Sequence, residues 1–123
     1  MSTRIIKINR GDSFSFTIGI TEKNSSKIHL LSADEVVYFA LLYPHQRFED
    51  AIFIRGYTLE DQNVETGNIL INIEPNDTRI LDSGVYYYTV KFKKGGTLIS
   101  VEELDEPIEV RTLIERTKFI IND

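Results

Sequence analysis

Two histidines are the natural first candidates for acid–base or metal chemistry, because no other side chain titrates near neutral pH without a perturbed pKa. They are His29 and His45, and a predicted strand separates them. Neither has a partner at the spacing of a metal site, and His45 lies in a polar loop that begins at Pro44. We therefore interpret them as surface histidines. The chain has no cysteine, which excludes a thiol nucleophile, a disulfide framework and a Cys-ligated metal.

Carboxylates gather in one short run near the C-terminal end of the chain. The run contains Glu102, Glu103, Asp105 and Glu106. Ca²⁺ prefers several oxygen ligands, but the run lacks the Asp-x-Asp-x-Asp-Gly pattern of a dedicated calcium loop. We interpret residues 102–106 as a solvated acidic loop, and a contact with a basic patch on a neighbouring subunit stays open.

Patterns that mark enzyme active sites do not occur in the sequence. There is no nucleophile elbow, no phosphate-binding glycine loop and no dinucleotide fingerprint. Ser-His-Asp catalysis needs an aligned base and a shaped oxyanion site, and nothing in the pattern supplies them. We predict no catalytic residue, no cofactor and no metal, although some hydrolases do use β-sandwich scaffolds.

Composition indicates one small domain with an ordinary surface. The chain has 123 residues, of which 41% are hydrophobic and 27% are charged. A net charge of -5 argues against nucleic-acid binding, which needs clustered Lys and Arg. We expect no membrane association, because no stretch approaches the roughly 18 apolar residues of a spanning helix. The N-terminus lacks the apolar run of a signal peptide, and the absent cysteines are compatible with assembly in a reducing cytosol.

Period-two alternation is the dominant pattern, and it is typical of strands with one buried face. In residues 12–20, Phe14, Phe16, Ile18 and Ile20 share one face. Residues 36–43 are apolar on both faces, which predicts a central strand that ends before Pro44. Further strands are predicted over residues 3–8, 51–59, 68–73, 85–93, 97–103 and 107–111. The stretch 112–121 has two interpretations, a short helix that carries Glu115, Arg116 and Lys118 or a terminal strand that includes Phe119-Ile120-Ile121, and we favour the strand. Seven to nine short strands predict an all-β antiparallel sandwich or barrel.

Turns and one short helical segment connect these strands. Arg10-Gly11-Asp12 predicts a turn, and Lys94-Gly95-Gly96 predicts a hairpin. Residues 75–82 predict a helical turn, capped by Asn76 or Asp77, with Ile80 and Leu81 in the core. Lys91, Lys93 and Lys94 are expected along the solvent edge of a strand, where lysine discourages aggregation.

The most specific local pattern is Asp82-Ser83-Gly84-Val85-Tyr86-Tyr87-Tyr88. It resembles the tyrosine corner of immunoglobulin domains, in which a tyrosine hydroxyl bonds back to upstream backbone. On this resemblance the structural corner consists of Asp82, Gly84, Tyr86 and Tyr88. Tyr88 stands where antibody domains carry cysteine, so apolar packing must replace the disulfide. Tyr87 has two interpretations, as a packing residue or as a ligand-stacking residue on an exposed sheet face.

The order of motifs resembles small immunoglobulin-like proteins of tailed bacteriophages, especially the N-terminal domain of the baseplate upper protein family. The likeness covers roughly residues 4–111. It rests on Arg10-Gly11-Asp12-Ser13-Phe14, the apolar strand Val36-Val37-Tyr38-Phe39-Ala40-Leu41, the spaced set Pro75, Thr78, Leu81, Gly84, Tyr86 and Tyr88, the glycines Gly95-Gly96, and the closing strand at Ile108-Val110. The stretch from Glu102 to Pro107 departs from the family's pattern.

The resemblance implies an immunoglobulin-like antiparallel β-sandwich over residues 1–111. Residues 112–123 then form a C-terminal strand or arm, which is a candidate contact element. The implied function is a non-enzymatic structural module of a virion, in the baseplate, tail, neck or capsid decoration. Its expected partners are other virion structural proteins in a homo-oligomer or symmetric assembly, and its expected location is the virion, assembled in the host cytoplasm. The loops at 44–50 and 60–67 are further candidate contacts. The alternative is a carbohydrate-binding or other ligand-binding β-sandwich module.

Overall fold

The computed structural model describes residues 4–22, 26–95 and 109–123, which form seven strands and three short helical turns. The helical turns are η1 (Phe48–Asp50), η2 (Leu59–Asp61) and α1 (Pro75–Thr78). The strands are β1 (Ile6–Asn9), β2 (Phe14–Gly19), β3 (Glu35–Leu42), β4 (Phe53–Tyr57), β5 (Asn68–Ile73), β6 (Gly84–Lys94) and β7 (Glu109–Asn122).

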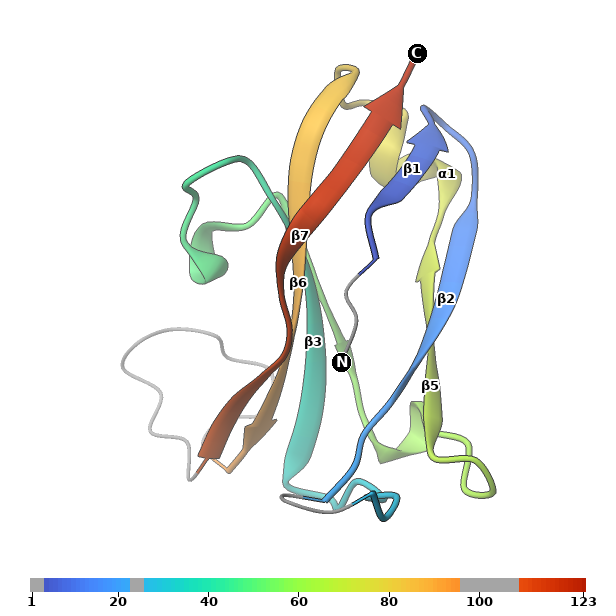
Figure 1. The fold of residues 1–123 in the computed structure, drawn as a ribbon, viewed down its shortest axis with the longest axis vertical. Coiled ribbons are helices and arrows are strands. Elements are labelled where there is room, and N and C mark those ends of the chain that lie inside the picture. The colour runs from blue at the N-terminus through green and yellow to red at the C-terminus, as the bar shows by residue number, and fades with distance from the viewer. Residues whose placement is uncertain (1–3, 23–25, 96–108) are drawn as a thin grey trace.

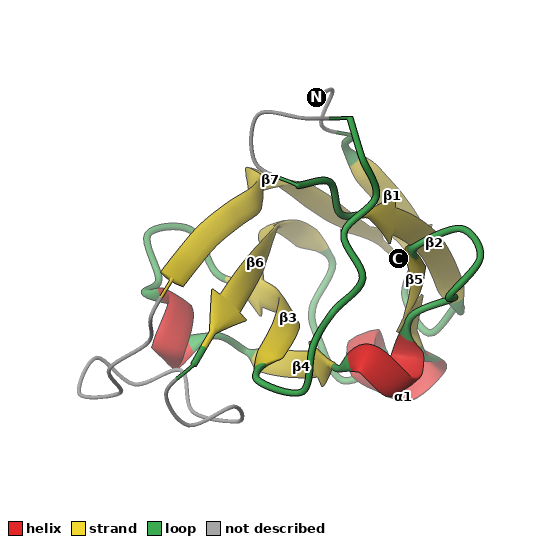
Figure 2. Ribbon diagram, turned by 90° about the horizontal axis from the view of Figure 1, so that it is seen from below, coloured by secondary structure: helices red, strands yellow, loops and turns green. Residues whose placement is uncertain are grey.

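The strands form two facing sheets, as Figure 1 and Figure 2 show. The larger sheet has the order β1-β7-β6-β3-β4, and the smaller sheet pairs β2 with β5. The chain is therefore an all-β, immunoglobulin-like sandwich, which confirms the predicted fold class. β1 and β7 pair in parallel, whereas the other strand pairs among the described residues are antiparallel.

The core lies between the sheets and is built from the alternation that the sequence displays. Phe14, Phe16 and Ile18 face inward from β2, and the residues between them are exposed. Three aromatic rings join the two sheets: Phe39 lies 6.1 Å from Phe16 and 5.9 Å from Tyr88, measured between ring centroids. Aromatic pairs at this separation stabilise the fold by more than their buried area alone would. This cluster is therefore the centre of the fold.

β3 is buried on both faces, as predicted for a central strand. Its outer face is covered in part by the connection to β4, where Phe48 packs edge-on against Tyr38. The predicted solvent edge of lysines is wrong, because β6 lies between β7 and β3 inside the larger sheet. Lys93 is only 6% exposed, and burial lowers the pKa of its ammonium group. Lys91 lies over the Phe48 ring at 4.7 Å.

β7 is one continuous strand from Glu109 to Asn122, and it joins the described part of the predicted strand at 107–111 to the predicted terminal strand. Its pairing with β6 is irregular twice, between Tyr88 and Val90 and between Val90 and Lys91. Each irregularity places an additional residue in β7, which bends and twists a strand. Residue 112, where the sequence suggests that the C-terminal arm begins, lies inside this strand and pairs with Lys91 of β6.

The predicted helical turn is shorter than expected, and two of its details are wrong. The N-cap is Glu74 rather than Asn76 or Asp77, and its N–H donates to the Asp77 carboxylate at 2.8 Å. Leu81 is buried as predicted, but Ile80 is 81% exposed. Arg10-Gly11-Asp12 does form the turn between β1 and β2, with Gly11 at φ 86°. The predicted strand at 97–103 and the acidic run at 102–106 lie outside the described residues.

Candidate functional site

The corner residues lie at the start of β6. The Tyr86 hydroxyl donates to the Asp82 carbonyl oxygen at 2.6 Å, and burial raises the pKa of this hydroxyl. Gly84 has φ 154°, a conformation that side chains with a Cβ rarely adopt. The Tyr88 hydroxyl donates to the Arg4 carbonyl oxygen at 2.5 Å and so ties the segment before β1 to the middle of β6. These two hydrogen bonds hold the start of β6 and the segment before β1 in place.

Removing the corner hydroxyl is expected to lower stability modestly. We expect Tyr86→Phe to reduce the free energy of unfolding by about 1 kcal/mol, because the Asp82 carbonyl oxygen loses its donor. Urea denaturation followed by circular dichroism measures the change. Tyr87→Phe is the matched control, since Tyr87 faces the other side of the sheet, and a shift below about 0.5 kcal/mol is expected there. Equal losses in the two variants would contradict a specific corner bond.

The two histidines occupy different environments. The prediction of a surface residue is wrong for His29, which is half-buried and whose Nε2 lies 2.9 Å from the Glu35 carboxylate. Because an ionised carboxylate only accepts hydrogen bonds, His29 Nε2 is the donor. His45 is exposed, as predicted, and has φ 65° in the turn after Pro44.

One long side of the sandwich is closed by a side chain. Arg55 of β4 reaches across to the smaller sheet, where it donates to the Asn72 carbonyl oxygen at 2.7 Å. It also makes a bidentate pair with the Asp77 carboxylate at 2.9 and 3.1 Å. Bidentate pairs of this kind add geometric specificity as well as stabilising energy. Arg55 therefore connects β4 to the smaller sheet at β5 and α1.

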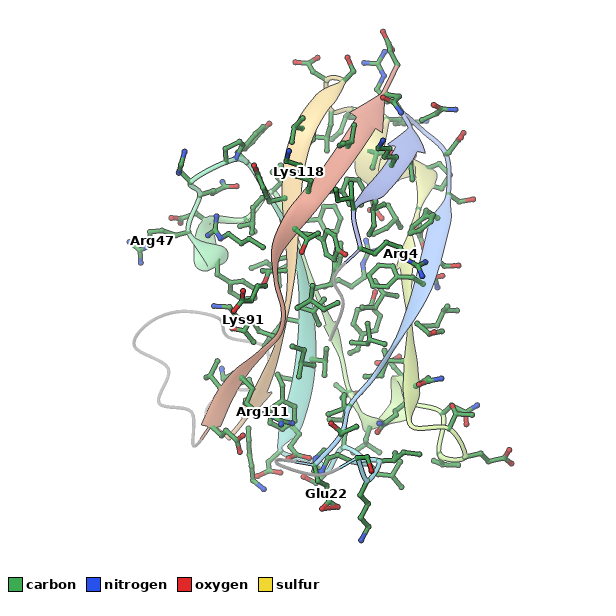
Figure 3. All side chains as sticks on the ribbon, in the orientation of Figure 1. Arg4, Glu22, Arg47, Lys91, Arg111 and Lys118 are labelled. Atoms are coloured by element: carbon green, nitrogen blue, oxygen red, sulfur yellow. The ribbon has the colours of Figure 1, made fainter. Side chains whose placement is uncertain are left out.

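The opposite long side, between β2 and β7, is open. β2 pairs only with β5 in the described chain, and β7 pairs with β1 only from Phe119 onward. Between these two edges runs a groove of about 600 Å³. Its walls include apolar side chains of both sheets, with Arg4 at the rim (Figure 3): Ile6, Phe14, Phe16, Ile18, Leu113 and Ile114. Beyond the end of β2, the Arg111 guanidinium of β7 donates to the Thr21 carbonyl oxygen at 3.3 Å.

The groove presents an apolar floor and two strand edges that have no partner strand among the described residues. Unpaired edges offer backbone N–H and C=O groups to an incoming strand. The bulged part of β7 lies along this groove, and the Thr89 hydroxyl donates to the Ile114 carbonyl oxygen there at 2.7 Å. Among residues 4–22, 26–95 and 109–123, no group of three or more His, Cys, Asp or Glu side chains gathers as a metal site would need. The arrangement is suited to binding a polypeptide segment.

The sequence predicts residues 112–123 as a contact element, but it does not predict that β2 lies across a groove from them. The missing step is the pairing of β1 with β7, which leaves most of one β7 edge uncovered. The adjacent apolar residues Leu113 and Ile114 are the only local sign, since strict alternation would bury just one of them. Tyr87 lines a separate pocket on the outer face of the larger sheet.

In the part of the chain that the structure describes, no helix is long and apolar enough to cross a membrane. No family model, no curated protein and no solved structure matches this chain.

Proposed function

We propose that the chain is a non-enzymatic structural module of a bacteriophage virion, and that it works by protein–protein contact along its open side. The motif order from Arg10 to Val110 suggests the phage class, as a resemblance. The single structural observation that carries the proposal is the groove between the unpaired edges of β2 and β7.

The occupant that suits this groove is an extended segment of a neighbouring virion protein. Strand addition gives affinity through main-chain hydrogen bonds and specificity through pockets for alternate side chains. Phe16 and Ile18 on one wall and Leu113 on the other offer such pockets for aliphatic side chains. Arg4 at the rim favours an acidic residue in the part of the segment that passes it, because opposite charges steer and register an encounter.

The bulges in β7 explain how the free chain avoids indiscriminate pairing. A bulged, strongly twisted edge is a poor template for a flat strand, and proteins use this device to prevent aggregation. The two bulges of β7 lie between Thr112 and Thr117, beside the groove. A segment that matches the twist of β7 can pair with this edge, whereas a flat strand cannot.

Virion incorporation tests the proposal. The double variant Ser15→Lys with Thr17→Lys places two charges along the β2 rim. Strand addition would have to remove water from these charges, so we expect loss of the chain from particles by at least about tenfold. Both residues are exposed, so the fold is retained. Quantitative mass spectrometry of purified particles is the measurement.

Ser83→Lys is the matched control, because Ser83 is exposed in the turn before β6 and far from the groove. This variant is expected to be incorporated like the unmodified chain. Absence of the unmodified chain from purified particles would overturn the virion assignment. Normal incorporation of the β2 variant would overturn the role of the open side.

A further inference from the structure

A second concave site lies on the outer face of the larger sheet, away from β2 and β5. Its volume is about 500 Å³. The residues that line it come from the β3–β4 connection, from β6 and from β7: Pro44, His45, Gln46, Arg47, Tyr87 and Arg116. Figure 1 shows this connection projecting on the side of β6 and β7 opposite β2, and the labelled Arg47 and Lys118 lie on that side in Figure 3.

The loop that forms one wall is held in shape by Gln46. Its side-chain oxygen accepts the Tyr43 N–H at 2.9 Å, and its amide nitrogen donates to the Asp50 carbonyl oxygen. From the other wall, the Arg116 guanidinium donates to the Gln46 carbonyl oxygen. The two walls are therefore connected before any ligand arrives, and preorganisation of this kind reduces the entropic cost of binding.

His45 occupies a backbone conformation that glycine or asparagine would adopt more easily. Its φ is 65°, and it is the sole non-glycine residue in the described chain with a positive φ. Residues held in this region store strain, and such positions concentrate at ligand-binding sites. His45 lines the pocket, where its imidazole adds a hydrogen-bonding group to the two arginines.

Among the residues that the structure describes, positive charge prevails around the pocket, although the chain as a whole is acidic. Arg47, Arg116 and, beside Tyr87 in the sheet register, Lys118 supply three cations. Among the acidic residues here, Asp50 lies 3.9 Å from Arg47, and Glu115 is exposed next to Arg116 in the chain. Arginine guanidinium groups recognise carboxylate and phosphate through paired hydrogen bonds, so an anionic group is the chemistry that this cluster selects.

The pocket is too large for a bare anion and has an aromatic wall. A volume of about 500 Å³ lies in the range of small-molecule sites, and the half-buried Tyr87 ring with Pro44 gives an apolar surface for a ring-shaped ligand. We propose that this pocket binds an anionic saccharide, a sugar ring that carries a carboxylate or a phosphate. Arg47 and Arg116 hold the anionic group, and Tyr87 packs against the ring. This proposal is independent of the virion role, since the groove lies on the other face.

Titration of the full chain, followed by amide chemical shifts, tests the pocket with four probes: glucuronate, glucose 6-phosphate, glucose and inorganic phosphate. Glucuronate or glucose 6-phosphate, or both, are expected to bind with Kd on the order of 1 mM. Whichever of the two binds identifies the source of the anionic group. Neutral glucose and inorganic phosphate are each expected to bind at least about tenfold more weakly. Equal affinity for glucose would overturn the role of charge, and equal affinity for inorganic phosphate would overturn the role of the ring. Failure of both anionic sugars to bind overturns the proposal.

Variants then assign the binding to the pocket. Arg47→Gln is expected to weaken binding at least about tenfold, through loss of a charge-assisted hydrogen bond. Arg79→Gln is the matched control, because Arg79 is exposed beside α1 and outside the pocket. Tyr87→Ser is expected to abolish ring contact, whereas Tyr87→Phe retains it and keeps the affinity within about twofold. Binding that survives both Arg47→Gln and Tyr87→Ser would place the ligand elsewhere.

Discussion

Replacing Phe39 by alanine is expected to lower the free energy of unfolding by about 3–5 kcal/mol, which is close to the whole stability of a small domain. Phe39 is fully buried in β3. Its ring contacts Phe16 of the smaller sheet, Tyr88 of β6 and Phe53 of β4, with ring centroids about 6 Å apart. Truncation leaves a cavity that these rigid rings cannot fill, so the cost of the lost contacts is not recovered.

Guanidinium denaturation measures this loss of unfolding free energy. Two further variants show whether the loss comes from the volume and position of the Phe39 ring. Phe39→Leu keeps most of the volume and is expected to cost about 1–1.5 kcal/mol. Phe48→Ala removes the same atoms from a half-buried ring on the outer face, where a loss of about 1–2 kcal/mol is expected. If Phe39→Ala and Phe48→Ala were equally destabilising, the ring cluster would not be the centre of the fold.

The same ring cluster links stability to the proposed contact surface. Phe16 and Tyr88 both line the groove, and both pack against Phe39. A strand bound in the groove would therefore cover the partly buried side of the core. Binding to the folded state raises apparent stability by mass action, so occupation of the open side should also protect the chain against unfolding.

Local patterns predict the strands well because their causes are local. Alternation in β2 and β6 places Phe16 and Tyr88 in the core whichever strands lie beside them. Residues 68–73 are predicted with the observed bounds of β5. The continuous apolar run of β3 likewise requires cover on both faces, and the structure supplies it. These assignments depend only on side-chain periodicity and proline or glycine chemistry.

Features that depend on strand order are not readable from periodicity. Lys93 looks like an edge lysine from its neighbours, but β7 returns beside β6 and places it inside a sheet. The groove exists because β1 covers only the last part of β7. The pocket on the outer face of the larger sheet lies between the loop after β3 and Arg116, which is 70 positions away in the chain from Gln46. Long-range pairings of this kind are fixed by the competition between topologies, which a single strand pattern does not encode.

The environment of His29 is also mispredicted because it depends on a contact with the start of β3. There, His29 belongs to a hydrogen-bond network around the buried Glu35 carboxylate. Glu35, at the start of β3, is only 3% exposed. Its carboxylate accepts hydrogen bonds from the Ser32 N–H at 2.8 Å and from His29 Nε2 at 2.9 Å, and Lys94 lies 3.8 Å away. Burial alone would raise the pKa of this carboxyl, but the bonds from Ser32 and His29 outweigh it and hold the pKa below its ordinary value of 4.5.

Glu35→Gln is expected to lower the free energy of unfolding by about 2–3 kcal/mol at about pH 7, because the charged acceptor of these bonds is lost while the volume is kept. The sign of the pH dependence follows from the lowered pKa. A group whose folded pKa is depressed stabilises the protein above its unfolded pKa, and this stability disappears as pH falls through the folded pKa. The unmodified chain should therefore lose stability below about pH 4.5, and the Glu35→Gln variant should lose less.

Urea denaturation at a series of pH values from about 7 to about 3 measures both curves. The gap between the unmodified chain and Glu35→Gln is expected to narrow as pH falls, because a protonated Glu35 resembles glutamine. Glu115→Gln is the matched control on the exposed face of β7, where a change below about 0.5 kcal/mol at every pH is expected. A gap for Glu35→Gln that stays constant from neutral to acidic pH would show that its hydrogen-bonded shape, not its charge, stabilises the start of β3.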